Sequence, residues 1–308
     1  MSGIKPVVTI GILTRNSEKF IRSVMMSILD QDFPHDLMEI IFVDESEDQT
    51  LAIIDSWKSK SDIRMKIFTV RDAGFGKSRN KILENAEGKY ILWMDSDNTL
   101  SKSYVKNQVN FMEGKPDVGI AIGMFGILPG WGSVLVLETL AWIAEFSRLA
   151  RNTQSSGRFR RTMRYPSTAG SICRIEALRR VNGFDEELRG VGEDIECSKR
   201  IARAGWKCCW NSYIWYETYG DMRTFLQLYR KYYLRGHGCQ TLYRKDNHAF
   251  SLPRMTPPAS FLSGILYSIA AYKITSRKLC FLMPIHFVFK FSAWLIGFAS
   301  AQIDNRNK

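Results

Sequence analysis

Two aspartates, Asp95 and Asp97, follow an apolar run over residues 90–94. An apolar run of this length that stops at polar residues predicts a buried strand ending in a loop. Residues two apart in extended backbone point to the same side, so the two carboxylates converge beyond the strand end. Hard oxygen ligands suit Mg²⁺ or Mn²⁺. The phosphates of the substrate usually complete the coordination shell of such a metal. A metal site is one interpretation, and an Asx-type turn with two solvated carboxylates is the other.

The elements that must position this pair alternate between strand and helix over the first 125 residues. Apolar, β-branched runs predict the strands, and residues such as Asn16 and Asp48 can cap the helices between them. The predicted strands cover residues 7–13, 39–43, 65–70, 90–94 and 118–125, and the predicted helices cover residues 18–30, 77–87 and a segment from about residue 49. Repeated units of this size predict an α/β fold with a doubly wound, mostly parallel sheet.

Each of the first four predicted strands runs into polar residues. In a parallel sheet these strand ends share one edge, and ligands bind in the crevice beside it. The residues are Thr14, Arg15 and Asn16 after the first strand, Asp44, Glu45 and Ser46 after the second, Arg71, Asp72 and Gly74 after the third, and Asp95 and Asp97 after the fourth. Acidic and basic side chains mixed in this way predict a nucleotide pocket.

Five segments in a fixed order resemble those of the family 2 glycosyltransferases. They are T-R-N at 14–16, V-D-E-S-E-D-Q-T at 43–50, G-F-G-K-S-R-N at 74–80, D-S-D at 95–97, and G-E-D at 192–194 with Arg200 and Gly205 behind it. The resemblance covers about two thirds of the chain and implies the GT-A nucleotide-diphospho-sugar transferase fold. It also implies a nucleoside-diphosphate sugar donor, carrying UDP or GDP, and a bound Mn²⁺ or Mg²⁺.

The resemblance implies a role for each matched residue. Thr14 and Asn16 would border the base and ribose, Asp44 would accept a hydrogen bond from the base, and Lys77 and Arg79 would lie near the diphosphate. Asp95 would contact ribose or metal, and Asp97 would ligate the metal. Asp194 would be the general base, supported by Glu193. Two of these positions have other interpretations: Asp194 as a helix N-cap and Lys77 as a solvated first-turn residue.

The chemistry requires few groups. A metal with a nearby arginine meets the negative charge of the leaving diphosphate, and a carboxylate on the opposite side takes the acceptor's proton. One base and a direct displacement imply inversion at the anomeric carbon. Gly74 and Gly76 are expected to let backbone approach phosphates at a helix N-terminus.

Residues 223–308 differ in composition from the catalytic domain expected over residues 1–222. Apolar stretches cover residues 261–272 and 279–301, and the second has Lys290 as its one formal charge. One interpretation is an interfacial first helix followed by a helix that spans or is buried in the membrane, and the other is two core helices. The aromatic and basic segment 225–233 is similar to that of succinoglycan-type members, which act on lipid-linked saccharides. The sequence therefore predicts membrane association and an acceptor such as a lipid-linked saccharide or polyprenyl phosphate, in polysaccharide biosynthesis.

Composition fits an enzyme at the cytoplasmic face of the cell membrane. The net charge is +12, which favours anionic lipid and phosphorylated substrates. We expect no nucleic-acid partner, because the basic residues are spread out and no known nucleic-acid motif occurs. The densest basic segment, 148–164 with six arginines, is compatible with a lid, a phosphate contact or a solvated loop. The six cysteines form no CxxC pair and predict free thiols.

Two other functions remain open from sequence. A sugar-nucleotidyltransferase would share the sheet but opens with a G-x-G-T-R-type loop, which residues 11–16 do not supply. A non-catalytic nucleotide-sugar-binding protein is the second, and the presence of both D-S-D and Glu193-Asp194 argues against it.

Overall fold

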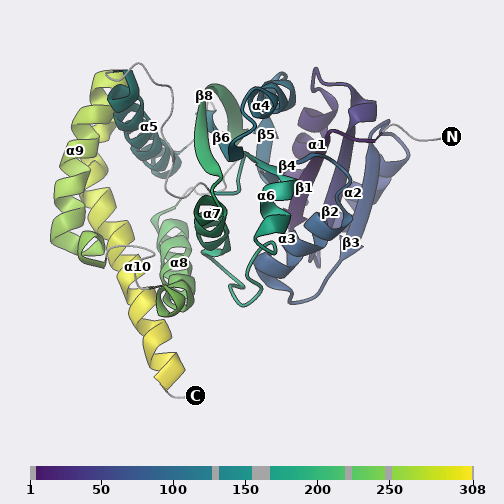
Figure 1. Ribbon diagram of the computed structural model, residues 1–308. Coiled ribbons are helices and arrows are strands. Elements are labelled where there is room, and N and C mark those ends of the chain that lie inside the picture. The colour runs from purple at the N-terminus through teal and green to yellow at the C-terminus, as the bar shows by residue number, and fades with distance from the viewer. Residues whose placement is uncertain (1–4, 127–131, 155–166, 219–223, 247–251, 307–308) are drawn as a thin grey trace. The chain divides into compact units, whose positions relative to one another are not determined.

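A computed structural model describes residues 5–126, 132–154, 167–218, 224–246 and 252–306 (Figure 1). The chain divides into two compact units. The first contains residues 1–126, 162–189 and 193–219, and the second contains residues 127–161, 190–192 and 220–308. Much of the basic segment 148–164 lies outside the described residues, so its predicted roles remain predictions.

Among its described residues, the first unit is built on one eight-stranded sheet in the order β3-β2-β1-β4-β7-β6-β8-β5. Strands β1 to β4 and the pair β6–β8 are joined in parallel, whereas β7 and β5 pair antiparallel with their neighbours. The strands are β1 (Val8–Thr14), β2 (Met38–Asp44), β3 (Arg64–Thr69), β4 (Tyr90–Asp95), β5 (Asn98–Leu100), β6 (Val118–Gly126), β7 (Ser171–Arg174) and β8 (Lys207–Thr218). The five predicted strands are confirmed within one residue at each end, and β5, β7 and β8 were not predicted.

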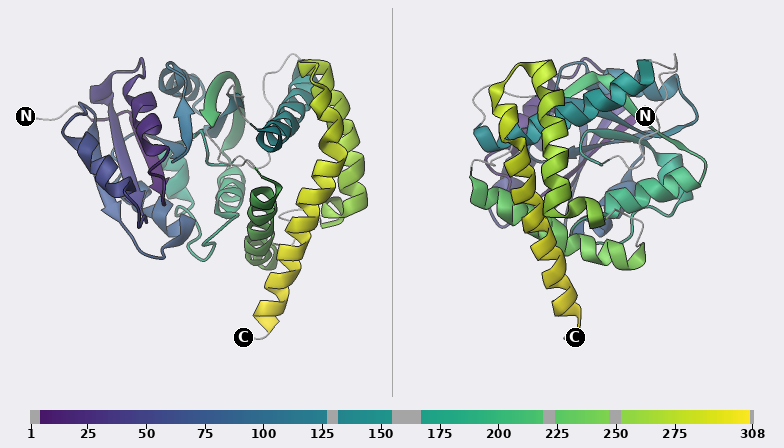
Figure 2. Two further views of the ribbon diagram at one scale, coloured as in Figure 1. Left: turned by 180° about the vertical axis from the view of Figure 1, so that it is seen from behind. Right: turned by 90° about the vertical axis from the view of Figure 1, so that its left-hand side faces the viewer.

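Helices cover both faces of this sheet (Figures 1 and 2). Alternate strand residues point to opposite faces, so Ile40 and Phe42 join one hydrophobic core while Ile41 and Val43 join the other. The first core packs α1 (Ile21–Leu29), α2 (Thr50–Lys58) and α4 (Tyr104–Glu113), and the second packs α3 (Gly74–Asn85), α6 (Ile175–Arg180) and α7 (Glu193–Arg203). The doubly wound α/β prediction is therefore confirmed.

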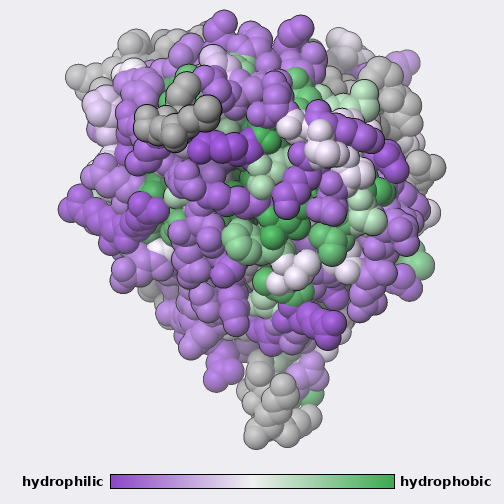
Figure 3. All heavy atoms as spheres, turned by 90° about the vertical axis from the view of Figure 1, so that its right-hand side faces the viewer, coloured by the Kyte–Doolittle hydropathy of each residue, from purple (hydrophilic) through white to green (hydrophobic). Residues whose placement is uncertain are grey.

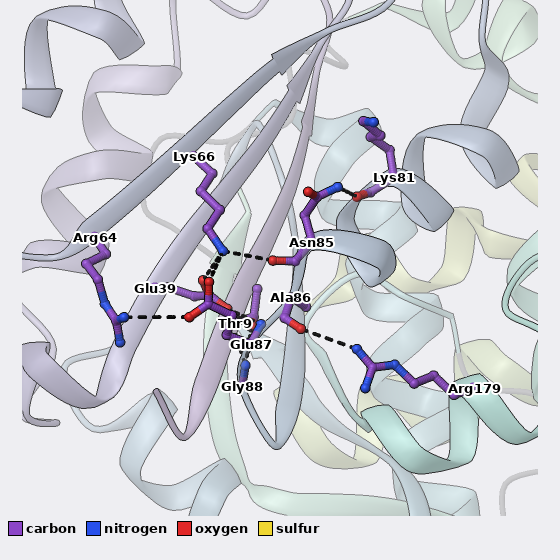
Figure 4. Close-up of polar contacts among 10 residues, drawn as sticks. All are labelled: Thr9, Glu39, Arg64, Lys66, Lys81, Asn85, Ala86, Glu87, Gly88 and Arg179. Carbon is purple, nitrogen blue, oxygen red and sulfur yellow. Dashed lines mark hydrogen bonds and ion pairs between the residues drawn. The ribbon is translucent and has the colours of Figure 1, made fainter. Parts of the chain in front are cut away.

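A buried carboxylate fixes the N-terminal ends of the central strands (Figure 4). Glu39 accepts hydrogen bonds from the Thr9 hydroxyl at 2.6 Å and from the backbone N–H groups of Glu87 at 2.6 Å and Gly88 at 3.3 Å. Lys66 on β3 balances its charge at 3.2 Å. These contacts join β1, β2, β3 and the entry to β4, at the edge of the sheet opposite the candidate site.

Strand β3 forms one edge of the sheet, and its side chains are partly exposed. Viewed from the side of β3, hydrophobic residues gather in the centre of the surface within a hydrophilic rim (Figure 3). Arg64 and Lys66 place charges on this strand, and such charges disfavour pairing of an edge strand with another chain.

The second unit is helical. Its helices are α5 (Ser133–Gln154), α8 (Phe225–Lys245), α9 (Pro257–Thr275) and α10 (Met283–Arg306), with short turns at Leu252–Met255 and Lys278–Leu282. Helix α8 begins with a capping box in which Thr224 and Gln227 satisfy each other's backbone N–H groups. Helices α9 and α10 run side by side (Figure 2). By length and composition, Lys278–Asp304 is apolar enough to cross a membrane, and 39% of its most apolar window is buried inside the structure.

Candidate functional site

The C-terminal ends of β1, β2 and β4 lie level with one another. The strand register pairs Thr14 with Asp44 and Leu13 with Asp95. Continuous parallel pairing therefore brings three of the predicted binding residues, Thr14, Asp44 and Asp95, to one edge of the sheet, as the sequence predicted.

Asp44 is buried and held by its neighbours. Its Oδ1 accepts hydrogen bonds from the Thr14 hydroxyl at 2.5 Å and the Ser46 hydroxyl at 2.7 Å, and its Oδ2 accepts from the Ser46 N–H at 3.2 Å. Asp44 is thus a pre-oriented acceptor at the strand end.

The loops behind these strands are tied together. Asn16, with a left-handed φ of 50°, donates its N–H to the Ser46 hydroxyl at 2.9 Å and accepts from the Glu47 N–H at 2.9 Å. The Ser17 hydroxyl lies 2.6 Å from that of Ser96, the residue between Asp95 and Asp97. Hydrogen bonds therefore connect the loop after β1 to the loops after both β2 and β4.

Asp95 and Asp97 flank Ser96 in the connection from β4 to β5. Asp95 is exposed at the last position of β4, and Asp97 is half-buried just before β5 begins. They offer hard carboxylate oxygens beside the Asp44 strand end, which is the donor type that Mg²⁺ and Mn²⁺ prefer. Within the described ranges, no cluster of three or more His, Cys, Asp or Glu side chains is placed to hold a metal.

Arg79 forms the centre of a second cluster. Its buried guanidinium donates to the Glu193 carboxylate and, at 2.7 Å, to the Thr168 hydroxyl. The rings of Phe75, Trp93 and Phe184 surround it at 5.4, 5.9 and 5.6 Å. An arginine held by a carboxylate and three aromatic rings is rigid, because both its charge and its planar face are engaged.

Glu193 is the first residue of α7 and follows Gly192, whose φ is +100°. Burial raises the pKa of its carboxyl to about 7, Arg79 opposes that shift, and Asp194 adds to it. The sequence predicted Glu193 and Arg79 at the site separately, but gave no signal that they pair with each other.

Asp194 lies in the first turn of α7, one residue past its start, where its Oδ1 accepts from the Ile195 N–H at 2.7 Å. It lines a cavity of about 10 Å³ together with Thr168 and Ser198. Most of its wall is apolar, with Ile120, Leu178 and Phe184 among the lining residues. Thr168 thus contacts Arg79 on one side and this cavity on the other.

The neighbouring Asn80 fixes the segment that leads to α7. Its amide donates to the Phe184 carbonyl at 2.9 Å and accepts from the Phe184 N–H at 2.8 Å. This paired contact imitates a backbone ladder. Arg79 and Asn80, adjacent on α3, therefore hold the chain on either side of the 185–192 loop.

The glycines of the same segment allow a close approach between two parts of the backbone. A Cβ at Gly76 would lie 2.3 Å from the Asp185 carbonyl oxygen, and one at Gly74 would lie 2.8 Å from the Arg189 backbone. The Phe75 N–H donates to the Arg189 carbonyl at 2.9 Å. These glycines let α3 approach the chain at 185–189. The predicted approach to phosphates stays a prediction.

The predicted residues therefore form two groups. The first group lies in the hydrogen-bonded loops after β1 and β2, next to the Asp95–Asp97 turn, and contains Thr14, Asn16 and Asp44. The second group lies on α3 and α7 and contains Arg79, Glu193 and Asp194. Lys77 is exposed in the first turn of α3. The sequence placed Ser46 at the pocket edge without giving it a role. Sequence reasoning missed Asn80, which lies inside a quoted segment, and Thr168, which stands in a stretch without any pattern.

Residues 9–179, more than half of the chain, match the family model described as glycosyl transferase family 2. Poly(ribitol-phosphate) β-N-acetylglucosaminyltransferase TarS of Staphylococcus aureus is 35% identical over 115 residues, covering 37% of this chain and 20% of TarS. The putative teichuronic acid biosynthesis glycosyltransferase TuaG of Bacillus subtilis is 32% identical over 113 residues, covering 36% of this chain and 44% of TuaG. The chain thus spans less than half the length of these relatives.

Solved structures share the fold. The mannosyltransferase PcManGT from Pyrobaculum calidifontis, in complex with GDP-Man and Mn²⁺, aligns with 98% of this chain and 88% of its own at a TM-score of 0.64 and 17% identity. S. aureus TarS 1-349 in complex with UDP-GlcNAc aligns with 97% of this chain and 92% of its own at a TM-score of 0.53 and 19% identity. With the family model matched and this architecture shared, the chain is a member of glycosyltransferase family 2 with the GT-A fold.

Proposed function

We propose that this protein transfers a sugar from a nucleoside-diphosphate sugar to a hydroxyl acceptor, with a divalent metal and with inversion at the anomeric carbon. The observation that carries the proposal is one edge of the sheet, where Thr14 lies level with Asp44 and Asp95 lies level with the preceding Leu13. The Ser17–Ser96 contact joins the loops at this edge. Such an edge is where open α/β sheets bind nucleotides.

The donor would bind across this edge. Thr14 and Asn16 would border the base and ribose, and Asp44, already oriented by two hydroxyls, would accept a hydrogen bond from the base. Asp95 would contact ribose or metal, and Asp97 would hold Mn²⁺ or Mg²⁺. When bound, the metal neutralises charge on the leaving diphosphate. Two carboxylates leave room in its shell for phosphate oxygens, and PcManGT, of the same fold, is described with GDP-Man and Mn²⁺.

The acceptor would be activated from α7. Asp194, in the first turn of α7, would take the proton of the attacking hydroxyl as general base. Glu193 would support it through Arg79. Lys77 and Arg79 would lie near the diphosphate. Because Arg79 is anchored by Glu193 and Thr168, its charge would also hold the start of α7 in place.

The acceptor is proposed as a lipid-linked saccharide, a polyprenyl phosphate or a related anionic glycan at the cytoplasmic face of the membrane. The net charge of +12 suits anionic acceptors. Relatives described as a poly(ribitol-phosphate) β-N-acetylglucosaminyltransferase and a teichuronic acid biosynthesis glycosyltransferase support this class. Residues 1–222 would carry the chemistry, and residues 223–308 the membrane association.

A panel of UDP- and GDP-sugars tests the proposal. Release of nucleoside diphosphate should occur with one sugar nucleotide in the presence of Mn²⁺ or Mg²⁺ and should stop in EDTA. Asp97→Ala should abolish release, whereas Asp55→Ala, which removes an exposed carboxylate from α2, should not. Full activity of Asp97→Ala in chelator would reject the metal assignment, and donor binding without any release or transfer would indicate a binding protein.

A further inference from the structure

Helix α9 exposes large apolar side chains and turns small residues inward. Helices of a water-soluble bundle usually do the reverse. Leu262, Ile265, Leu266 and Ile269 are exposed, with Leu262 63% and Leu266 68% accessible. Their spacing of three, four and seven residues makes one continuous stripe. The small residues Gly264 and Ser268 point inward instead, and a Cβ at Gly264 would lie 2.5 Å from Pro284 of α10.

Two more exposed apolar side chains lie at the corner between α9 and α10. Phe281 is 55% exposed and Ile285 is 68% exposed. A continuous exposed apolar face of this kind marks an interaction site on a soluble protein, because water does not solvate it favourably.

The border of this face is basic. Lys273, Arg277 and Lys278 are exposed at the end of α9 and in the following turn. The sequence contains no Asp or Glu from residue 252 to residue 303. A partner that is apolar in its interior and negatively charged at its surface therefore fits, and an anionic lipid bilayer has both properties.

Helix α10 is held inside its unit by buried polar groups. The Glu138 carboxylate on α5 accepts from His286 Nε2 at 2.6 Å, from Lys290 Nζ at 2.8 Å and from the Tyr232 hydroxyl at 2.6 Å. Glu138, His286 and Lys290 are all buried. Removing Lys290 from Glu138 into hydrocarbon would expose an unpaired charge to lipid, which is costly.

Helix α10 also touches the backbone of α8. A Cβ at Gly297 would lie 2.0 Å from the Tyr233 carbonyl oxygen, and a Cβ at Gly236 would lie 1.9 Å from the Trp294 carbonyl oxygen. Helix α8 carries exposed charges, among them Arg230 and Lys231. If α10 crossed a bilayer with these contacts intact, the charges of α8 would be drawn into the lipid.

We propose that α9 lies in the plane of an anionic bilayer and that α10 stays packed on α5 and α8 without crossing it. The stripe formed by Leu262, Ile265, Leu266 and Ile269 enters the headgroup–acyl boundary with the corner at Phe281 and Ile285. Lys273, Arg277 and Lys278 contact lipid phosphates. This inference rests on the proposed membrane location and is independent of the transfer chemistry.

Vesicle sedimentation of the full chain tests the contact. The protein should bind phosphatidylcholine vesicles that contain phosphatidylglycerol more tightly than vesicles of phosphatidylcholine alone. Leu262→Ser/Leu266→Ser/Ile269→Ser should reduce binding at least about tenfold. Lys273→Gln/Arg277→Gln/Lys278→Gln should remove most of the preference for anionic lipid, at about fivefold per charge. The matched control Met26→Ser, which removes an exposed apolar side chain from α1, should bind as the wild type does.

A labelling experiment distinguishes lying in the plane from spanning. Ser276→Cys and Ile303→Cys are exposed positions near the two ends of the apolar segment, while all six native cysteines are buried. With vesicle-bound protein, a membrane-impermeant thiol reagent added outside should label both positions without detergent. Protection of either one until detergent is added would overturn the in-plane arrangement in favour of a span.

Nucleotide binding measured on the same samples separates the two proposals. A stripe variant that loses vesicle binding but keeps wild-type affinity for UDP or GDP is folded, and its loss supports the lipid contact. If the wild type ignores both kinds of vesicle while binding nucleotide, the lipid contact is wrong and the transferase proposal is unaffected.

Discussion

Changing Asp194 or Asp44 to asparagine should affect different kinetic parameters. Asp194→Asn removes a base, so kcat should fall roughly 10²–10⁴-fold while donor affinity stays near wild type. Asp44→Asn weakens an acceptor for the nucleobase, so KM should rise more than kcat falls. Steady-state kinetics with calorimetry of the sugar nucleotide measures both effects. Near-normal turnover of Asp194→Asn would move the search for the base to Glu193.

Glu193 should make stability depend on pH. Its carboxyl has a pKa of about 7 in the fold, raised by burial, against about 4.3 in an unfolded chain. Between these values the folded protein keeps a proton that the unfolded chain releases, so rising pH favours unfolding. The loss of stability reaches at most roughly 4 kcal/mol and is complete above pH 7. Denaturant unfolding at pH 5 and pH 8 should show a smaller pH dependence for Glu193→Gln than for the wild type. Equal dependence in both proteins would contradict the assignment.

At the scale of elements, the crossing of α8 and α10 depends on two glycines. The Cβ added by Gly236→Ala or Gly297→Ala would meet a carbonyl oxygen of the facing helix at 1.9 or 2.0 Å, so the helices must separate. We expect each variant to lose about 1–3 kcal/mol of stability, as overpacked sites do. Gly132→Ala is the matched control, because its Cβ meets nothing within 4 Å. Thermal unfolding measures the loss, and equal Tm values for all three variants would contradict the close crossing.

The elements that sequence predicted correctly are those with a strong local pattern. Five strands are apolar runs that stop at polar residues: β1, β2, β3, β4 and β6. Because β1, β2 and β4 end at one edge of the sheet, Thr14, Asp44 and Asp95 lie at that edge together. Strands β5 and β7, of three and four residues, are too short to carry a period. Their place depends on pairing with distant strands, which spacing along the chain does not encode.

Long-range pairing also limited the prediction of the site. Arg79 and Glu193 are 114 positions apart, and neither position alone signals the ion pair. Gly74 and Gly76 were predicted as points of close approach, and the structure adds a neighbour that the sequence did not indicate, the chain at 185–189. A glycine shows that space is needed without showing what fills it.

At the scale of the whole chain, the two units hold their residues together by different means. The candidate nucleotide edge lies in the first unit and is fixed by hydrogen bonds between loops. The second unit is fixed by buried charge around Glu138. Burial raises the pKa of the Glu138 carboxyl, but the charges of Lys290 and His286 outweigh burial and hold this pKa below its usual range. Damage to the charge cluster should therefore leave the nucleotide edge intact.

Glu138→Ala tests this independence. The change leaves Lys290 and His286 buried without their anion, and breaking a buried pair in this way costs about 3–5 kcal/mol. We expect a lower unfolding temperature and faster proteolysis within α8 to α10, while calorimetric affinity for UDP or GDP with Mn²⁺ stays within about twofold of wild type. Asp304→Ala is the control, because it breaks an exposed pair with His237 and exposed pairs contribute little. Loss of nucleotide binding in Glu138→Ala, with Asp304→Ala unchanged, would mean that the helical unit supports the donor site, and the two units would then have to be treated as one folding unit.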